Sequence, residues 1–317
     1  MIVRNEESNL PRVLGSVLGL VDESVVVDTG STDRSVEVAK SLGARVEFFE
    51  WIDDFSAARN HALSMARGDW IMVLDADDEF EREDIPLARR ILETSRASGV
   101  SVRHFLLYPG EPPGVKRQMA FVRNRPEHRY VWRVHEQIPV DPATVERSAL
   151  RVTHHGYTPE LLPLKNGRNR RLLERMKSDP DPLGRVAASF YLGTLHQWEK
   201  RHPDAIREFK AAAYSGLPCP YRLYSVFRLA QLASMAGERD YAESLLRVLL
   251  DANPGLIEAE LELADLCREA GRIDEARRHF EISSASRLRL LPYESTPWED
   301  RARARLRGAL FGLEVSR

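Results

Sequence analysis

Cysteine and long apolar runs are scarce in this chain of 317 residues. Its two cysteines, Cys219 and Cys267, lack metal-ligand spacing and give no disulfide framework, which fits a reducing cytoplasm. No apolar run approaches the roughly 20 residues of a membrane-spanning helix, and the N-terminus lacks the layout of a signal peptide. We therefore expect a soluble, cytoplasmic protein without a membrane span.

The chain also lacks a strong charge of either sign, with a formal net charge of −2. This balance argues against a dominant nucleic-acid surface, although 40 of the 46 basic residues are arginine and only six are lysine. A hydrophobic content of 43% with 30% charged residues is ordinary for a globular protein, and the length allows two domains. Disordered and fibrous classes are excluded.

Strands and helices alternate from Met1 to about Tyr108. Alternation of this kind predicts parallel crossovers and a doubly wound α/β sheet. The first strand begins with the first residue, so a few residues of that strand could precede Met1. The predicted strands are Met1–Val3, Val25–Asp28, Val46–Phe49, Trp70–Leu74 and Val102–Tyr108.

Three helices are expected between these strands. The first presents one apolar face at helical spacing, made of Leu10, Val13, Leu14, Val17 and Leu18. The second would be capped by Ser31 or Thr32 and ended by Gly43. The third follows Phe55, and Gly68 would close it.

The segment WIMVLDADDE, residues 70–79, is the most informative part of the chain. A run of strand formers ends in four acidic residues, and such close like charges need water or a cation. Side chains of a strand alternate with period two, so Asp75 and Asp77 point the same way. Such a pair suits a divalent cation that also binds a phosphate. The alternative is an Asp-rich turn without a ligand.

Polar loops follow three of the predicted strands: RNEES, DTGSTD and DADDE. In a doubly wound sheet, ligands bind beyond the carboxyl ends of the strands, where these loops would meet. The sequence therefore predicts a nucleotide site built from all three loops.

The second half of the chain repeats. Gly193, Ala230 and Ala264 are each followed by an alanine twelve residues later, and the copies are offset by 37 and 34 residues. Helical hairpins with small residues at fixed points pack closely and stack on one another. The pattern resembles three tetratricopeptide repeats, with a capping helix in 287–317. We expect domains at 1–178 and 179–317.

The first half resembles glycosyltransferase family 2. The resemblance rests on MIVRNEE, VVVDTGSTD, WIDDFSAARNHAL, GDWIMVLDADDE and VWRVHEQI, in this order, and continues through HHGY and KNGRNRRLL to about Leu173. It is closest to the subgroup related to lipopolysaccharide-core glucosyltransferases and SunS-like peptide glycosyltransferases, which also contains C-terminal tetratricopeptide arrays. The resemblance implies a GT-A-type, Rossmann-like mixed sheet that binds a nucleotide sugar.

The same resemblance implies roles for the acidic residues. Asp28 would accept a hydrogen bond from the nucleotide base, or else cap the following turn. Asp75 and Asp77 match the ends of a D-x-D motif, with Asp77 on the metal and Asp75 on ribose or metal. The ion would be Mg²⁺ or Mn²⁺, and it would clamp the diphosphate of the donor.

Four further residues have two interpretations each. Arg59 could pair with a phosphate or form a structural pair with Asp54. Glu7 could touch the nucleotide or begin a helix. Glu136 is the candidate catalytic base, and the alternative is a strand glutamate that faces solvent. His154 could complete the metal shell or be an ordinary surface or core histidine.

We therefore expect a metal-dependent, inverting glycosyltransferase with a nucleoside-diphosphate sugar as donor. The acceptor would be a peptide, a protein or a cell-envelope glycan, and the repeats could bind a protein partner or form a homodimer. The alternatives are a non-catalytic interaction scaffold with a degenerate transferase domain, and a nucleotidyl transferase with similar carboxylates.

Overall fold

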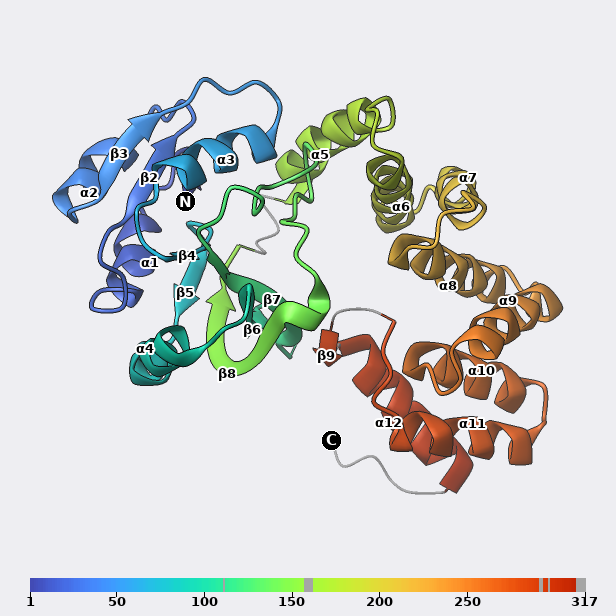
Figure 1. The fold of residues 1–317 in the computed structure, drawn as a ribbon. Helices are drawn as coiled ribbons and strands as arrows, with labels where there is room; N and C mark the ends of the chain where they lie inside the picture. The colour runs from blue at the N-terminus through green and yellow to red at the C-terminus, as the bar shows by residue number, and fades with distance from the viewer. Residues whose placement is uncertain (111, 157–161, 291–292, 296, 312–317) are drawn as a thin grey trace. The chain divides into compact units, whose positions relative to one another are not determined.

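The computed structural model describes residues 1–110, 112–156, 162–290, 293–295 and 297–311. The chain divides into two compact units, Met1–Leu172 and Leu173–Arg317 (Figure 1). Helix α5 (Leu162–Met176) contains the division. The boundary expected from the sequence, after residue 178, lies just beyond the end of this helix.

The first unit begins with three short parallel strands. They pair in the order β1-β2-β3, and helices α1 and α2 make the crossovers that parallel neighbours require (Figure 1). The elements are β1 (Ile2–Val3), α1 (Leu10–Ser16), β2 (Val25–Asp28), α2 (Ser35–Ser41) and β3 (Arg45–Phe48). The predicted parallel crossovers are confirmed for this part of the chain.

Helices α1 and α2 differ from the prediction at one end each. Leu18 was expected on the apolar face of α1, but the helix ends at Ser16 and Leu18 is 69% exposed. The chain turns at Gly19, whose φ of +83° a glycine adopts readily. The predicted caps of α2 are wrong, since the helix starts only at Ser35. Gly43 ends it as predicted, with a φ of +82°.

A mixed sheet forms the rest of the first unit. Its strands are β4 (Trp70–Met72), β5 (Asp78–Phe80), β6 (Gly99–Leu106), β7 (Gly114–Arg123) and β8 (Val145–His154), in the order β4-β7-β6-β8-β5. Only the β6–β8 pair of these is parallel. The mixed sheet is confirmed, and the parallel crossovers expected up to Tyr108 do not extend to β4 and β6, which both pair antiparallel with β7. The reason is a hairpin, because the turn near Gly110 returns the chain directly from β6 into β7.

Helices α3 (Phe55–Met65) and α4 (Ile85–Thr94) belong to the same unit, together with the 3₁₀ turns η1 (Arg82–Asp84) and η2 (Pro142–Thr144). The side chain of Asp54 caps α3 by accepting from the N–H of Ala57 at 3.0 Å. The prediction that Gly68 closes this helix is wrong. Ala66 already has an extended backbone, and the side chain of Asn124 donates to its carbonyl at 3.0 Å.

The second unit is helical, apart from a short strand, β9 (Tyr293–Ser295). Three consecutive helical hairpins are followed by one further helix (Figure 1). The helices are α6 (Pro182–Trp198), α7 (His202–Ala213), α8 (Pro220–Met235), α9 (Arg239–Ala252), α10 (Ile257–Glu269), α11 (Ile273–Ala285) and α12 (Pro297–Phe311). The predicted tetratricopeptide-type architecture is confirmed.

The repeated small residues lie inside the hairpins. Ala205, Ala242 and Ala276 are fully buried. Gly193 lies so close to Phe209 that an added Cβ would be 2.7 Å from the ring. Small residues therefore set the distance between the two helices of a hairpin. Helix α12 closes the stack through buried residues such as Leu306, in the place expected for a capping helix.

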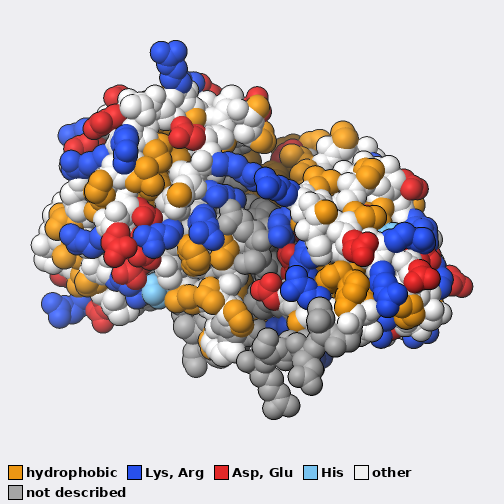
Figure 2. All heavy atoms as spheres, turned by 90° about the horizontal axis from the view of Figure 1, so that it is seen from below, with side chains coloured by type: hydrophobic (Ala, Val, Ile, Leu, Met, Phe, Trp, Pro, Cys, Tyr) orange, Lys and Arg blue, Asp and Glu red, His pale blue; other side chains and the backbone are white. Residues whose placement is uncertain are grey.

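Charged side chains of both signs are interspersed with apolar ones over the face seen in Figure 2. This mixture matches the small net charge of −2. Within the described ranges, every helix is too short or too polar to span a bilayer.

Candidate functional site

The loops after β1 and β2 are joined by hydrogen bonds between side chains and backbone. The N–H of Asn5 donates to Ser31 Oγ at 2.9 Å, and the N–H of Thr32 donates to Asn5 Oδ1 at 2.7 Å. Glu7 Oε2 accepts from the N–H of Arg34 at 2.9 Å. Glu7 therefore fixes the start of α2, and its contact with a nucleotide stays a prediction.

Asp28 lies at the carboxyl end of β2 and is 3% exposed. Its carboxylate accepts from the N–H of Gly30 at 3.0 Å and from the N–H of Ser31 at 3.1 Å. Asp28 thus caps the turn that follows it, which was the alternative interpretation. A carboxylate has about four acceptor positions, so these bonds leave capacity for a nucleotide base, and that role stays a prediction.

The acidic segment after β4 folds into a tight turn. The N–H of Asp75 donates to Asp78 Oδ2 at 3.0 Å, and the N–H of Asp78 donates to the carbonyl of Asp75 at 3.1 Å. The turn separates the acids by exposure, since the side chains of Asp75, Asp77 and Asp78 are 39%, 18% and 3% exposed. Asp75 and Asp77 are therefore the ones available to a ligand.

Asp78 organises two histidines from neighbouring strands. Its Oδ1 lies 3.0 Å from His104 Nε2 and 2.9 Å from His154 Nδ1, and Gln118 Oε1 lies 2.9 Å from His104 Nδ1. Burial alone would raise the pKa of Asp78, but the bonds to both histidines outweigh it and hold the pKa well below its usual range. Burial would lower the pKa of His154, and its bond to Asp78 with the nearby Asp77 charge raises it instead.

The sequence analysis did not identify Asp78 or His104 as functional. Asp78 was visible as the third aspartate of DADDE, while His104 lies on β6 and is far from it in sequence. Only the pairing of β6 and β5 with β8 brings both residues next to His154.

Asp77 and His154 form the candidate metal site. Asp77 Oδ1 lies 3.5 Å from His154 Nδ1. Both side chains converge over Gly156, where an added Cβ would be 1.9 Å from Asp77 Oδ2 and 2.8 Å from His154 Nε2. The ammonium of Lys165 already stands 3.3 Å from Asp77 Oδ2, so this corner accommodates a cation. Oxygen ligands with one imidazole suit Mg²⁺ or Mn²⁺.

Asp78, His104 and His154 also offer ligand atoms within 4.8 Å of one another. The shared Asp78 oxygen is already bonded to both rings, so this trio orders the site rather than binding an ion. In the HHGY motif, Tyr157 lies outside the described residues.

Arg59 of α3 connects two acidic residues that are distant in sequence. Its Nη2 donates to Asp75 Oδ1 at 2.6 Å and its Nε donates to Glu136 Oε1 at 2.5 Å. The predicted alternative pair with Asp54 is wrong, because Asp54 caps α3 and lies 3.8 Å from Arg133. Burial alone would lower the pKa of Arg59. The charges of Asp75 and Glu136 outweigh burial and raise this pKa well above its usual range.

Glu136 lies in an irregular loop rather than in a strand. Its side chain is only 12% exposed, so a solvent-facing strand glutamate is wrong. Trp132 and His135 of the same loop have φ of +76° and +52°, which bulky residues adopt only when their surroundings impose it. The loop is thus built to hold Glu136 against Arg59.

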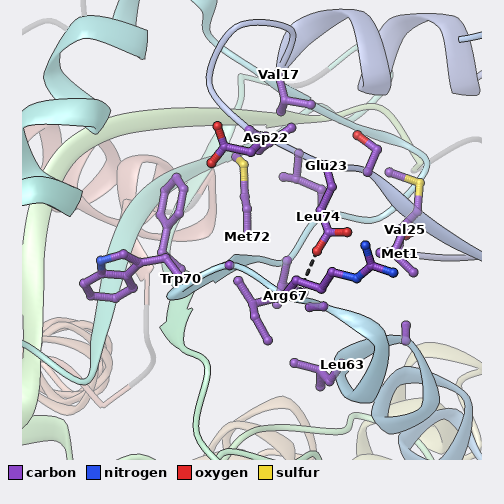
Figure 3. Close-up of a pocket in the computed structure, with 18 of the residues that line it drawn as sticks. Met1, Val17, Asp22, Glu23, Val25, Leu63, Arg67, Trp70, Met72 and Leu74 are labelled. Carbon is purple, nitrogen blue, oxygen red and sulfur yellow. Dashed lines mark hydrogen bonds between the residues drawn. The ribbon is translucent and has the colours of Figure 1, made fainter. Parts of the chain in front are cut away.

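The lining of an apolar cavity of about 510 Å³ includes Arg59. Figure 3 shows a close-up of this cavity. Residues such as Leu63, Met72 and Leu74 line it, and Glu23 at its edge accepts from the N–H of Arg67 at 2.6 Å. Asp28, Asp77 and Glu136 are not among the lining residues of this cavity, so it is distinct from the carboxylate corner where the donor is expected.

Comparison with known proteins identifies the first unit. The model of the family described as "Glycosyl transferase family 2" matches residues 1–150. A TPR repeat-containing protein of Synechococcus elongatus is 33% identical over 289 residues, which cover 86% of this chain and 71% of that protein. The glycosyltransferase SunS of Bacillus subtilis is 30% identical over 190 residues, which cover 56% of this chain and 44% of SunS.

The chain is also similar to a further protein over a short stretch and to a solved structure. An uncharacterized glycosyltransferase of Rickettsia typhi is 40% identical over 83 residues, 26% of this chain and 28% of that protein. The structure of S. aureus TarS 1–349 covers 88% of both chains at 13% identity, with a TM-score of 0.40. Residues 1–150 therefore belong to glycosyl transferase family 2, and a helical unit of the tetratricopeptide type follows them.

Proposed function

We propose that the protein is a metal-dependent, inverting glycosyltransferase that uses a nucleoside-diphosphate sugar. The observation that carries this proposal is the guanidinium of Arg59, which holds Asp75 and Glu136 on two of its nitrogens. One side chain thereby links the D-x-D corner to the candidate base. A donor held at that corner would have its sugar within reach of Glu136.

The donor would bind where the three polar loops meet. Asp77 and His154 would hold Mg²⁺ or Mn²⁺, and Asp75 would contact the ion or the ribose. The bound ion neutralises the charge that develops on the leaving diphosphate. Asp28 would contact the nucleotide base, with Glu7 fixing the adjoining loop.

Glu136 would act as the base. Its carboxylate accepts the proton of the acceptor while the acceptor atom forms a bond to the anomeric carbon. The bond from that carbon to the diphosphate oxygen breaks on the opposite face, and the diphosphate leaves with the electron pair. Attack opposite the leaving group inverts the anomeric configuration. Arg59 fixes the position of Glu136 before the acceptor arrives.

The acceptor would be a peptide or protein, or alternatively a cell-envelope glycan. Helical repeats usually bind polypeptide. Large apolar side chains are exposed on this unit, among them Trp198, Tyr214 and Met235 at 58%, 68% and 70%. These residues offer contacts for a polypeptide chain. The transfer reaction would take place in the cytoplasm.

Turnover of a panel of nucleotide sugars with and without Mn²⁺ tests the proposal. We expect Mn²⁺-dependent release of a nucleoside diphosphate, lost in Asp77→Asn and Glu136→Gln. Glu50→Gln is the matched control. Glu50 is exposed, and its substitution removes an equal charge from the same unit. NMR of the product gives the anomeric configuration, and retention would refute the inverting mechanism.

Nucleotide protection against thermal unfolding separates this proposal from its rival. A ligand that binds the native state raises the melting temperature. No shift with any nucleoside diphosphate, with or without Mn²⁺, would favour a non-catalytic scaffold. Release of inorganic diphosphate would instead identify a nucleotidyl transferase.

A further inference from the structure

Lys165 lies near the start of α5, in the segment KNGRNRRLL that the proposed mechanism does not use. Its Nζ is 3.3 Å from Asp77 Oδ2 and 3.3 Å from the carbonyl oxygen of Gly156. The lysine thus occupies the same carboxylate oxygen that would face the metal ion.

This contact differs from a structural ion pair in the same chain. Lys177 lies 3.0 and 2.9 Å from the two carboxylate oxygens of Glu208, whose side chain is 6% exposed. Lys165 has one longer contact to Asp77, whose side chain is 18% exposed, while the two lysine side chains are exposed alike, at 36% and 34%. An ion pair of that exposure adds little to stability, so stability does not explain why Lys165 is there.

The charges around Lys165 explain its position better. Asp75 and Asp77 lie in the same corner, and both charges raise the pKa of Glu6, which burial raises most. Lys165 opposes this effect, so its ammonium balances part of the negative charge of the corner. A divalent ion on Asp77 would displace the ammonium by charge repulsion.

The displaced ammonium would remain close to the donor. Lysine carries its charge on a flexible stem, and an ammonium binds phosphate as a point charge. Arg168, three residues later on the same helix, lies with its guanidinium over the ring of Phe55, 4.7 Å from the ring centre. Burial lowers the pKa of Arg168, and the nearby charge of Glu136 opposes this shift. The side of α5 that carries Lys165 and Arg168 is therefore turned toward the candidate site.

We propose that Lys165 is a donor-binding residue that exchanges Asp77 for the diphosphate when metal and nucleotide bind together. This inference rests on the proposed function of the site. Without nucleotide, Lys165 competes with the metal ion for Asp77. With nucleotide, it contacts the diphosphate and strengthens the complex. Metal ion and nucleoside diphosphate thus bind cooperatively.

Binding measurements on Lys165→Ala in the full chain test the exchange. Mn²⁺ alone, followed by the EPR signal of the free ion, should bind about two- to fivefold more tightly to the variant, the range of a partly exposed ion pair. A nucleoside diphosphate in the presence of Mn²⁺, followed by calorimetry, should bind about tenfold more weakly, as expected for a lost hydrogen bond to a charged group. The two affinities should therefore move in opposite directions.

Two control variants complete the experiment. Lys40→Ala removes an equal charge from an exposed position on α2 and should change neither affinity. Lys165→Arg keeps the charge and should retain most of the nucleotide affinity. A circular dichroism melt shows whether each variant is folded, and Lys165→Gln replaces the alanine variant if that one unfolds.

The outcomes separate this inference from the proposed function. Failure of the unchanged protein to bind Mn²⁺ with any nucleoside diphosphate overturns both. If the unchanged protein binds them and the Lys165 variants do the same, only the role of Lys165 is overturned. Weaker binding of both ligands by a folded variant also overturns it, because a merely structural residue would have that effect.

Discussion

Replacing Arg59 by alanine removes the side chain that donates hydrogen bonds to both Asp75 and Glu136. The side chains of Arg59 and Glu136 are 13% and 12% exposed. The change therefore leaves the nearly buried carboxylate of Glu136 without the guanidinium that lies 2.5 Å from it. Breaking a buried pair costs about 3–5 kcal/mol. Asp75 is 39% exposed and water compensates it in part, so we expect a loss at the lower end of that range, about 3 kcal/mol.

The catalytic rate should fall as well. Glu136 would no longer be fixed, and a displacement of about 1 Å near the reacting atoms costs about 100-fold in rate. We expect kcat to fall about 100-fold in Arg59→Ala while KM for the donor changes little, because the metal corner at Asp77 is intact. Arg59→Lys keeps a charge but loses the planar fork, so it should recover only part of the rate.

Steady-state kinetics and thermal unfolding of the same preparations measure both effects. Arg147→Ala is the matched control, because Arg147 is exposed on β8 and its loss should leave rate and melting temperature unchanged. A folded Arg59→Ala protein with the kcat of the unchanged protein would refute the assignment of Arg59 as a positioning residue and weaken that of Glu136 as the base.

Four further substitutions have defined outcomes. Asp78→Asn should weaken Mn²⁺ binding about tenfold or more, because residues that orient a metal ligand have effects of that size; unchanged Mn²⁺ affinity would contradict this. Gly193→Ala should destabilise the second unit by about 1–3 kcal/mol, since the added Cβ would be 2.7 Å from Phe209. Gly167 is exposed on α5 with open space around it, so Gly167→Ala should stabilise the protein by up to about 1 kcal/mol. The melting temperatures of the two variants should therefore shift in opposite directions. Asp54→Ala should cost about 1 kcal/mol by removing the cap of α3, and an equal denaturation midpoint would contradict it.

Elements with a clear local signal could be predicted from the sequence. Alternating segments gave the three parallel strands, and the helical spacing of Leu10, Val13 and Leu14 gave a helix whose apolar face is buried. The repeat of Gly193, Ala230 and Ala264 gave the helical hairpins, because each copy packs by the same local rule. The helix signal depends on residues within one or two turns of each other, and the repeat signal depends on a fixed spacing of 37 and 34 residues.

The arrangement of the second sheet could not be predicted in the same way. Whether β6, β7 and β8 run parallel or antiparallel depends on how the intervening loops return the chain, and several turn residues are compatible with either. The parallel crossovers of the first three strands therefore did not predict how Trp70–Met72 and Gly99–Leu106 pair, which is antiparallel with β7.

The candidate site, too, could be predicted only in part from the sequence. DADDE marked the acidic corner, but Asp75 and Asp78 have opposite exposures that only the turn between them decides. The contact of Arg59 with Glu136 joins residues 77 positions apart, and no local pattern predicts it. His104 lies 26 positions from its partner Asp78, and it gave no signal on its strand.

A crystal of the protein grown with Mn²⁺ and a nucleoside diphosphate tests the central claim most directly, through the anomalous scattering of manganese. The account predicts one manganese peak in contact with Asp77 and His154, joined to the diphosphate. Clear nucleotide density with the manganese elsewhere, or no manganese at that corner, would contradict it.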